Sequence, residues 1–272
     1  LSMVEITKKY KIGTRRFGLV NWYGTWTLYV KEVLRFLNVW AQTLFSPLIS
    51  SLLFLLVLSL AIGTERGEVL GVSFITFLAP GLIAMQIIQQ AFSHSSSSLM
   101  IKKIDGTIVD LLFAPLSASE ATIAISLAAV TRSVLLAIIS IITFTIIIDI
   151  QIQNYLTLIS FTFLSSFILG NIGIIAGLWA EKFDNMATVT NFIIVPLSFL
   201  SGTFYSIERL PGFLQTVSEF NPFFYMIDGF RYSFIGKADG SITFGITYLI
   251  ILSFVSWLVA YILYKKGYKI KS

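Results

Sequence analysis

Cysteine is absent from the 272 residues, and histidine occurs once, as His94. Without cysteine the chain can form no disulfide, no thiolate metal site and no cysteine nucleophile. A single histidine argues against a histidine-rich metal site and against a relay of histidines for protons. These absences leave the redox compartment open, but they remove several classes of enzyme from consideration.

Charged residues are also scarce. Asp, Glu, Lys and Arg make up 12% of the chain, against about 25% in ordinary soluble domains. Hydrophobic residues make up 56%, and the mean hydropathy is +0.85. A single soluble core of this length cannot bury so much apolar side chain, so the surplus must face lipid. The composition therefore indicates an integral membrane protein.

Three common sequence signals are missing as well. The first three dozen residues are basic and aromatic without a compact apolar run, so we expect no secretory signal peptide. Gly236-Lys237-Ala238 lacks the upstream glycine and the hydroxyl of a phosphate-binding loop. His94 lies beside a run of serines without a Gly-x-Ser-x-Gly turn, which favours a solvated helix end over a hydrolase dyad. We therefore expect neither catalysis nor a bound cofactor or metal on this chain.

Six apolar stretches are long enough to cross a hydrocarbon core about 30 Å thick, which takes about 20 helical residues. They lie at residues 38–62, 69–92, 120–148, 155–180, 187–207 and 242–264. The predicted fold class is all-α and integral to the membrane. The chain divides into a cytoplasmic segment, residues 1–37, and a six-helix transmembrane domain, residues 38–272.

The positions of lysine and arginine predict the orientation. Fourteen of the nineteen lie before the first span, in the second and fourth connections, or in the tail. By the positive-inside rule this side is the cytoplasm, so both termini are expected there, in a multi-pass protein of the inner membrane. The net charge is +5, but the basic residues flank the apolar runs instead of clustering as they would in a basic groove. We therefore predict no nucleic-acid partner.

Before the first span, apolar and aromatic residues recur at spacings of three and four. They are Trp22, Trp26, Tyr29, Val33, Leu37 and Trp40. This pattern predicts an amphipathic helix lying on the cytoplasmic leaflet. An extension of the first membrane helix is the alternative.

The second connection, residues 93–119, is the longer cytoplasmic one and predicts a short helix. Asp105 and Thr107 are suitable N-cap residues, and a proline at position 115 limits the helix at its far end. Such a helix places Ile108, Leu111 and Leu112 on one side. An exposed apolar helix outside the membrane is expected to bind a groove in another protein.

The fifth connection, residues 208–241, is not a polar loop. Pro211 and Pro222 each begin a short apolar segment and would occupy the first turn of a helix. Neither segment is long enough to cross the membrane. Two half-helices that re-enter the outer leaflet fit this pattern, because protein would bury their backbone.

Polar side chains form stripes on three of the predicted spans. They are Gln42, Ser46 and Ser50 on the first, Gln86 and Gln90 on the second, and Asn191, Ser198 and Tyr205 on the fifth. Such faces turn toward neighbouring helices or toward a pathway, and packing alone is the alternative for each residue. The presence of a polar stripe on three spans favours a translocation path.

Arg132 is the only charged residue well inside a predicted span, which disfavours ion coupling through buried carboxylates. It could contact a substrate head group, or it could snorkel or bond backbone carbonyls, and we assign it a structural role. In the fourth span Gly173 and Gly177 share a small-residue face that allows close helix packing.

Three stretches resemble the ABC-2 family of exporter permeases, which are six-helix subunits of transporters for drugs, polysaccharides and lipid-linked glycans. Residues 103–116 read KIDGTIVDLLFAPL, residues 196–205 read PLSFLSGTFY, and Leu210-Pro211 precedes NPFFYMIDGFR at residues 221–231. Their order and spacing match the family over nearly the whole chain. Many members of the family have Arg-Glu where this chain has Ile104-Asp105. We therefore expect the polar contact at this position to differ from theirs.

The resemblance implies a homodimer or pseudo-dimer of permeases surrounded by membrane lipids, each bound to a cytoplasmic ATPase that carries ATP and Mg. A hydrophobic, lipid-linked or polysaccharide substrate would pass between the two permeases. The coupling helix would comprise Asp105, Gly106, Thr107, Ile108, Asp110, Leu111 and Leu112, and Pro222, Asp228 and Arg231 would be structural. An ATPase-independent channel or a lipid-scaffolding protein is the alternative.

Overall fold

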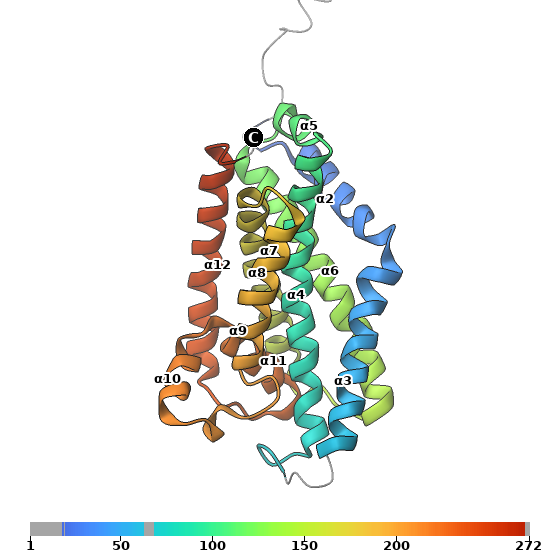
Figure 1. Ribbon diagram of the computed structural model, residues 1–272, viewed down its shortest axis with the longest axis vertical. Coiled ribbons are helices and arrows are strands. Elements are labelled where there is room, and N and C mark those ends of the chain that lie inside the picture. The colour runs from blue at the N-terminus through green and yellow to red at the C-terminus, as the bar shows by residue number, and fades with distance from the viewer. Residues whose placement is uncertain (1–17, 19, 63–67, 270–272) are drawn as a thin grey trace, which may run out of the picture.

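Helices account for every regular element in the computed structural model, which describes residues 18, 20–62 and 68–269. Six of them are long and apolar enough to cross a membrane, namely Ala41–Ala61, Phe74–Ile104 (α4), Ala118–Ile148 (α6), Tyr155–Trp179 (α7), Phe183–Leu200 and Ile242–Lys265 (α12). They pack side by side as an elongated bundle (Figure 1). The predicted fold class is confirmed.

Polar residues begin the long helices, as local sequence chemistry requires. Ser117 accepts a hydrogen bond from the Glu120 amide while the Glu120 side chain accepts one from the Ser117 amide, a complete capping box at the start of α6. Asn154 caps α7 and Ser241 caps α12 in the same manner. These caps satisfy amides that the first helical turn leaves without partners.

The first and fifth spans each contain a π-helical segment. Ala41–Phe45 (η1) precedes α3 (Ser46–Ile62), and Thr190–Ile194 (η2) lies between α8 (Phe183–Val189) and α9 (Val195–Leu200). Each π turn takes an extra residue, so side chains on either side of it leave the register of a regular helix.

Helix α2, Trp22–Leu37, is separate from the first span and does not extend it in a straight line (Figure 1). It packs against α6, where the Tyr29 hydroxyl lies 2.8 Å from the Thr131 hydroxyl. Trp22 and Trp26 are exposed, whereas Glu32 and Phe36 are buried. The predicted aromatic stripe is therefore divided: Trp22 and Trp26 are exposed, whereas Tyr29 contacts α6.

Helix α4 lies at the centre of the bundle and packs against α7. A Cβ atom at Gly173 would lie 2.6 Å from the carbonyl oxygen of Phe92, and one at Gly177 would lie 2.9 Å from that of Ser96. The structure thus places both glycines where the backbones of α4 and α7 approach closely.

The second span is longer than we expected from the sequence. We predicted that it ends at residue 92 and that His94 is a solvated helix end; instead α4 continues to Ile104, and His94 is fully buried. The serines explain the difference: Ser96 donates to the carbonyl of Phe92 at 2.7 Å and, being small, lies against the glycines of α7. Serine thus serves as a packing residue here.

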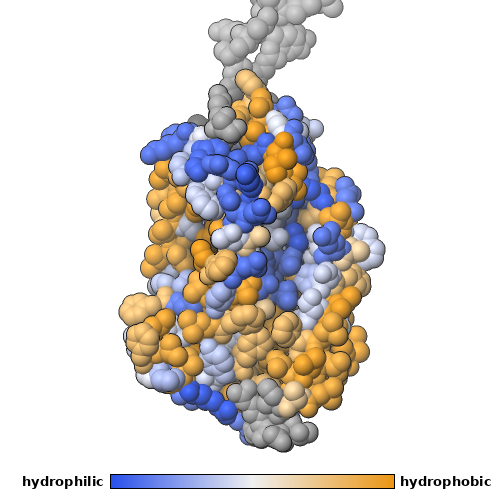
Figure 2. Space-filling model, viewed as in Figure 1, coloured by the Kyte–Doolittle hydropathy of each residue, from blue (hydrophilic) through white to orange (hydrophobic). Residues whose placement is uncertain are grey.

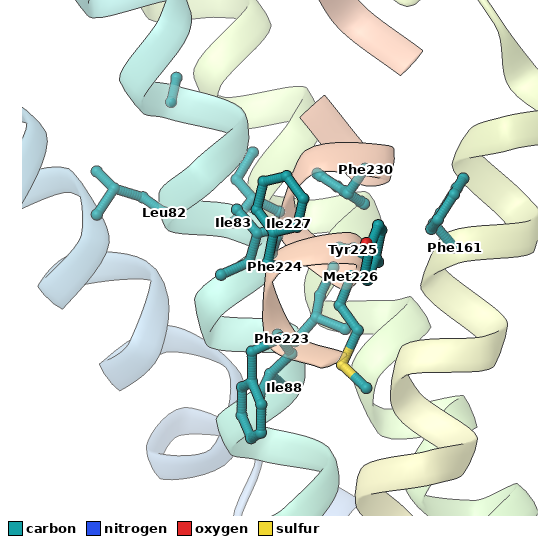
Figure 3. Close-up of a cluster of buried hydrophobic side chains, with 14 of the residues drawn as sticks. Leu82, Ile83, Ile88, Phe161, Phe223, Phe224, Tyr225, Met226, Ile227 and Phe230 are labelled. Atoms are coloured by element: carbon teal, nitrogen blue, oxygen red, sulfur yellow. The ribbon is translucent and has the colours of Figure 1, made fainter. Parts of the chain in front are cut away.

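The short helices gather at the two ends of the bundle. Helix α5 (Ile108–Phe113) lies near the start of α2 and the end of α12, whereas α10 (Gly212–Phe220) and α11 (Pro222–Ile235) lie toward the other end (Figure 1). Figure 3 shows the side chains of α11 packed with Ile83 and Ile88 of α4 and Phe161 of α7. The fifth connection thus contains two short helices, and α11 belongs to the hydrophobic core.

Candidate functional site

A polar cavity of about 810 Å³ opens between α3, α4 and α9, at the end of α2. Figure 2 shows a hydrophilic stripe along α4, bordered on both sides by apolar surface. The lining residues are Arg35, Phe36, Val39, Gln42, Thr43, Ser46, Pro47, Ser50, Phe54, Met85, Gln86, Gln89, Gln90, Ser93, Ser97, Ile101, Arg132, Val195 and Phe199. We call this set the polar cavity.

Five of the eight residues predicted for a path line the polar cavity together: Gln42, Ser46, Ser50, Gln86 and Gln90. A spacing of four residues keeps Ser46 and Ser50 on one face of α3, and Gln86 and Gln90 on one face of α4. Gln42 lies in the π turn η1 and lines the same cavity. The Ser50 hydroxyl donates to the Ser46 carbonyl at 2.9 Å, so this hydroxyl is satisfied within its own helix. Four glutamines contribute side-chain amides to the lining of the polar cavity.

The other three predicted path residues do not line it. Asn191 is exposed elsewhere, the buried Ser198 donates to the Ile194 carbonyl at 2.7 Å, and the Tyr205 hydroxyl donates to the Leu200 carbonyl at 3.2 Å. The π turn of η2 explains the separation of Asn191 from Ser198, because its extra residue shifts the helical register between them. Val195 and Phe199 form this wall instead.

Gln89, Ser93 and Ser97 also line the polar cavity, although we did not predict them. With Gln86 and Gln90 they follow the helical spacings of three, four, seven and eleven residues. The helical spacing of these polar residues can be seen in the sequence. Because we predicted that the second span ends at residue 92, the pattern was divided between a helix and a loop.

Arg132 reaches the polar cavity from the middle of α6. Its guanidinium donates a hydrogen bond to the side-chain oxygen of Gln90, its Nε has no partner, and the residue is 6% exposed. Among the described residues, no carboxylate lies within 4 Å of this guanidinium. This hydrogen bond of Arg132 thus goes to a side chain of α4 rather than to a backbone carbonyl.

A buried ion pair fixes the end of α2 to α4 beside the polar cavity. Glu32, 1% exposed, pairs with Lys102 of α4 and with Arg35, whose Nε lies 3.1 Å from a Glu32 oxygen. Burial by itself would raise the pKa of Glu32, but the charges of Lys102 and Arg35 outweigh it and hold that pKa at about 2. Arg35 also donates to the His94 carbonyl at 2.9 Å, which positions it at the rim.

Helix α5 presents two different faces. Ile108 and Leu111 are buried against the body of the protein, whereas Leu112 is 40% and Phe113 is 85% exposed. The single apolar side expected from the sequence is therefore divided. Asp105, Gly106, Thr107 and Asp110 are exposed around it, and Gly106 has a φ of +73° in the turn that precedes the helix.

At the opposite end, Asp228 and Arg231 of α11 hold the connecting segments. Arg231 donates to the carbonyl of Gly202 at 2.6 Å, and its guanidinium lies 3.9 Å from the centre of the Phe77 ring. Asp228 accepts hydrogen bonds from the amides of Asp239 and Gly240 at 3.0 and 2.9 Å. Proline 222 occupies the first turn of α11. These contacts hold the segments that flank α11 against the bundle.

Within the described ranges, no group of three His, Asp or Glu side chains could hold a metal ion. The arrangement offers a polar cavity in the side of a membrane bundle and a helix with an exposed apolar tip at one end of the bundle. Both features suit a transport protein that works with a partner.

Comparison with known proteins agrees with this arrangement. A family model described as the ABC-2 type transporter matches residues 23–235. The inner membrane transport permease YadH of Escherichia coli (strain K12) is 31% identical over 253 residues, which cover 92% of this chain and 98% of YadH. Nodulation protein J of Neorhizobium galegae is 22% identical over 245 residues, 88% of this chain and 92% of that protein. The chain therefore belongs to the ABC-2 type transporter family, as a multi-pass permease of the inner membrane.

Proposed function

We propose that this permease is the membrane subunit of an ATP-driven exporter, energised by a separate cytoplasmic ATPase that binds ATP and Mg. The observation that carries the proposal is the exposed apolar tip of α5. Leu112 and Phe113 project from a helix whose other face is anchored in the bundle by Ile108 and Leu111. An apolar tip that is exposed on a rigid base is suited to fill a groove in a partner and to transmit its motion.

The orientation follows from the same end of the molecule. Helix α5, the start of α2 and the end of α12 lie together there (Figure 1), and these elements and the ends of the helices beside them carry most of the lysines and arginines among the described residues. The positive-inside rule then assigns this end to the cytoplasm, with both termini on that side. Single cysteines at Asp105 and Glu219, both exposed in this cysteine-free chain, test it with an impermeant maleimide. Labelling of the Asp105→Cys variant from outside would overturn the orientation.

The polar cavity provides the route for cargo in this proposal. It faces the surface of a single chain, between α3 and α9, and a second copy placed against this face would enclose it. The cargo would be a hydrophobic, lipid-linked or polysaccharide molecule that leaves the cytoplasm or the inner leaflet between the two permeases. No nucleic acid is involved.

The test is co-purification of the permease with an ATPase encoded beside it. We expect Phe113→Asp to abolish association while the permease still inserts into the membrane, because a charge replaces the exposed apolar tip. Phe213→Asp is the matched control: Phe213 is 78% exposed at the opposite end of the molecule. Retained association in Phe113→Asp would contradict the proposal.

A second measurement separates the exporter from the alternative, an ATPase-independent channel or lipid scaffold. Proteoliposomes that contain the permease and the ATPase should show cargo movement that requires ATP. Movement that continues without ATP, at the same rate, would favour the alternative.

A further inference from the structure

Arg132 carries a buried positive charge that the described part of the protein does not neutralise. It lies about 21 Å and 24 Å from the two ends of α6, at 1.5 Å per residue. Its hydrogen-bond partner is a neutral amide, on Gln90, and its Nε is unpartnered. Burying a charge in this way costs free energy unless a counter-charge is supplied. If Arg132 had only a structural role, the free-energy cost of burying its charge would not be offset by any counter-charge.

The surroundings of Arg132 are positive rather than neutral. The lining of the polar cavity contains two arginines, Arg35 and Arg132, and no Asp or Glu. Glu32 lies behind the rim, where Arg35 shares it with Lys102. One carboxylate thus serves two cations there and is not available to Arg132. A ligand that enters this cavity meets a net positive charge.

The polar cavity is not uniformly polar. Arg132 and the glutamines of α4 contribute polar side chains to its lining, and Phe54, Met85, Val195 and Phe199 contribute apolar ones. Its volume of about 810 Å³ lies within the range of about 300 to 1,000 Å³ that is usual for small-molecule sites. A ligand that fits both surfaces has an anionic group at one end and an apolar portion at the other.

We propose that Arg132, together with Gln90, binds the anionic phosphate-type head group of an amphiphilic cargo, whose apolar portion lies along Phe54 and Phe199. A phosphate oxygen would accept from the unpartnered Nε and complete the guanidinium's hydrogen bonds. Arg35, at the rim, attracts the same charge as the cargo enters. The inference rests on the proposed function only in taking the polar cavity as the cargo route.

The test measures occupancy of the polar cavity in the purified full-length permease, without any ATPase. Ser46→Cys, which lines the cavity, introduces a single cysteine whose labelling by a maleimide reports on access. The probes are a lysophosphatidic acid, a lysophosphatidylcholine with the same acyl chain, and inorganic phosphate. We expect the lysophosphatidic acid to protect the cysteine at concentrations at least about ten-fold lower than the choline compound requires. Inorganic phosphate should not protect at millimolar concentration.

The variants then assign the protection to Arg132. In the Ser46→Cys background, Arg132→Gln should weaken protection by lysophosphatidic acid about ten-fold or more, and Arg132→Lys should retain part of it because it keeps the charge. Arg209→Gln, the same loss of charge at an exposed position outside the cavity, should change nothing. A measurement of thermal stability shows whether the Arg132→Gln protein is folded. If it is not, the protection measured in Arg132→Lys and the comparison of the two lysolipids test the inference instead.

Three results would overturn the inference: equal protection by the choline compound, protection by inorganic phosphate alone, or undiminished protection in a folded Arg132→Gln protein. Because the assay contains no ATPase, these results leave the exporter proposal standing. Conversely, a wild-type permease that does not associate with its ATPase would contradict the exporter proposal. It would leave the result on head-group binding unchanged.

Discussion

Glu32 of α2 and Lys102 of α4, seventy residues apart in the chain, form an ion pair inside the protein, and Ser98 donates a hydrogen bond to the same carboxylate at 2.8 Å. The pair joins the helix beside the first span to the end of the central helix that leads into α5. These two side chains therefore fix α2 to the end of α4 that precedes α5.

Glu32→Gln should destabilise the permease strongly. The substitution leaves Lys102 largely buried without its counter-charge, and removal of one member of a buried ion pair typically costs about 3 to 5 kcal/mol. The measurement is the thermal unfolding midpoint of the protein purified in detergent. Glu208→Gln is the control, since that carboxylate is exposed. A Glu32→Gln protein as stable as the control would show that the ion pair does not hold α2.

The same carboxylate predicts a dependence of stability on pH. The pKa of Glu32 is about 2 in the folded protein, against an ordinary value of 4.5. A lowered pKa means that the group stabilises the fold above pH 4.5, and that this contribution, about 3 kcal/mol, is lost as the pH falls from 4.5 toward 2. The midpoint should therefore fall more steeply between pH 5 and pH 3 in wild-type protein than in Glu32→Gln. Parallel curves would contradict the assignment.

Gly173→Ala should weaken the packing of α7 on α4. The added Cβ would lie 2.6 Å from the carbonyl oxygen of Phe92, which belongs to the backbone and cannot move aside alone. Overpacking of this kind typically costs about 1 to 3 kcal/mol. Gly212→Ala has no atom within 4 Å of its new Cβ and is the control. Equal thermal midpoints for the two variants would show that the helices can separate freely.

Tryptophan substitutions at two serines should have different effects. Ser46 is exposed in the polar cavity, so Ser46→Trp should block export while leaving folded yield and ATPase association intact. Ser198 is fully buried, so Ser198→Trp should lower folded yield first, through overpacking. Export and yield are measured for both variants. Normal export by a well-folded Ser46→Trp protein would remove the polar cavity from the route.

Local patterns in the sequence were sufficient for the membrane class, the six spans and the short helix α5. A membrane span requires length and apolar composition, and a helix cap requires one polar residue at the helix start. Both can therefore be predicted from the sequence without knowing which helices pack together. The shared face of Ser46 and Ser50 could also be predicted, because a period of four residues keeps one face of a helix, whereas the π turn that contains Gln42 could not.

Only the tertiary structure decided what these faces meet. The serines after residue 92 could form a polar loop or a packing face; in the structure Ser95 and Ser96 pack against the glycines of α7, whereas Ser93 and Ser97 line the polar cavity. Periodicity places Arg132 on a helix face but does not say that Gln90 of α4 lies opposite it, nor does it reveal the π turn that separates Asn191 from Ser198. Contacts between helices depend on which side chains fit together across a shared interface, and that is a property of the assembled bundle rather than of any one segment.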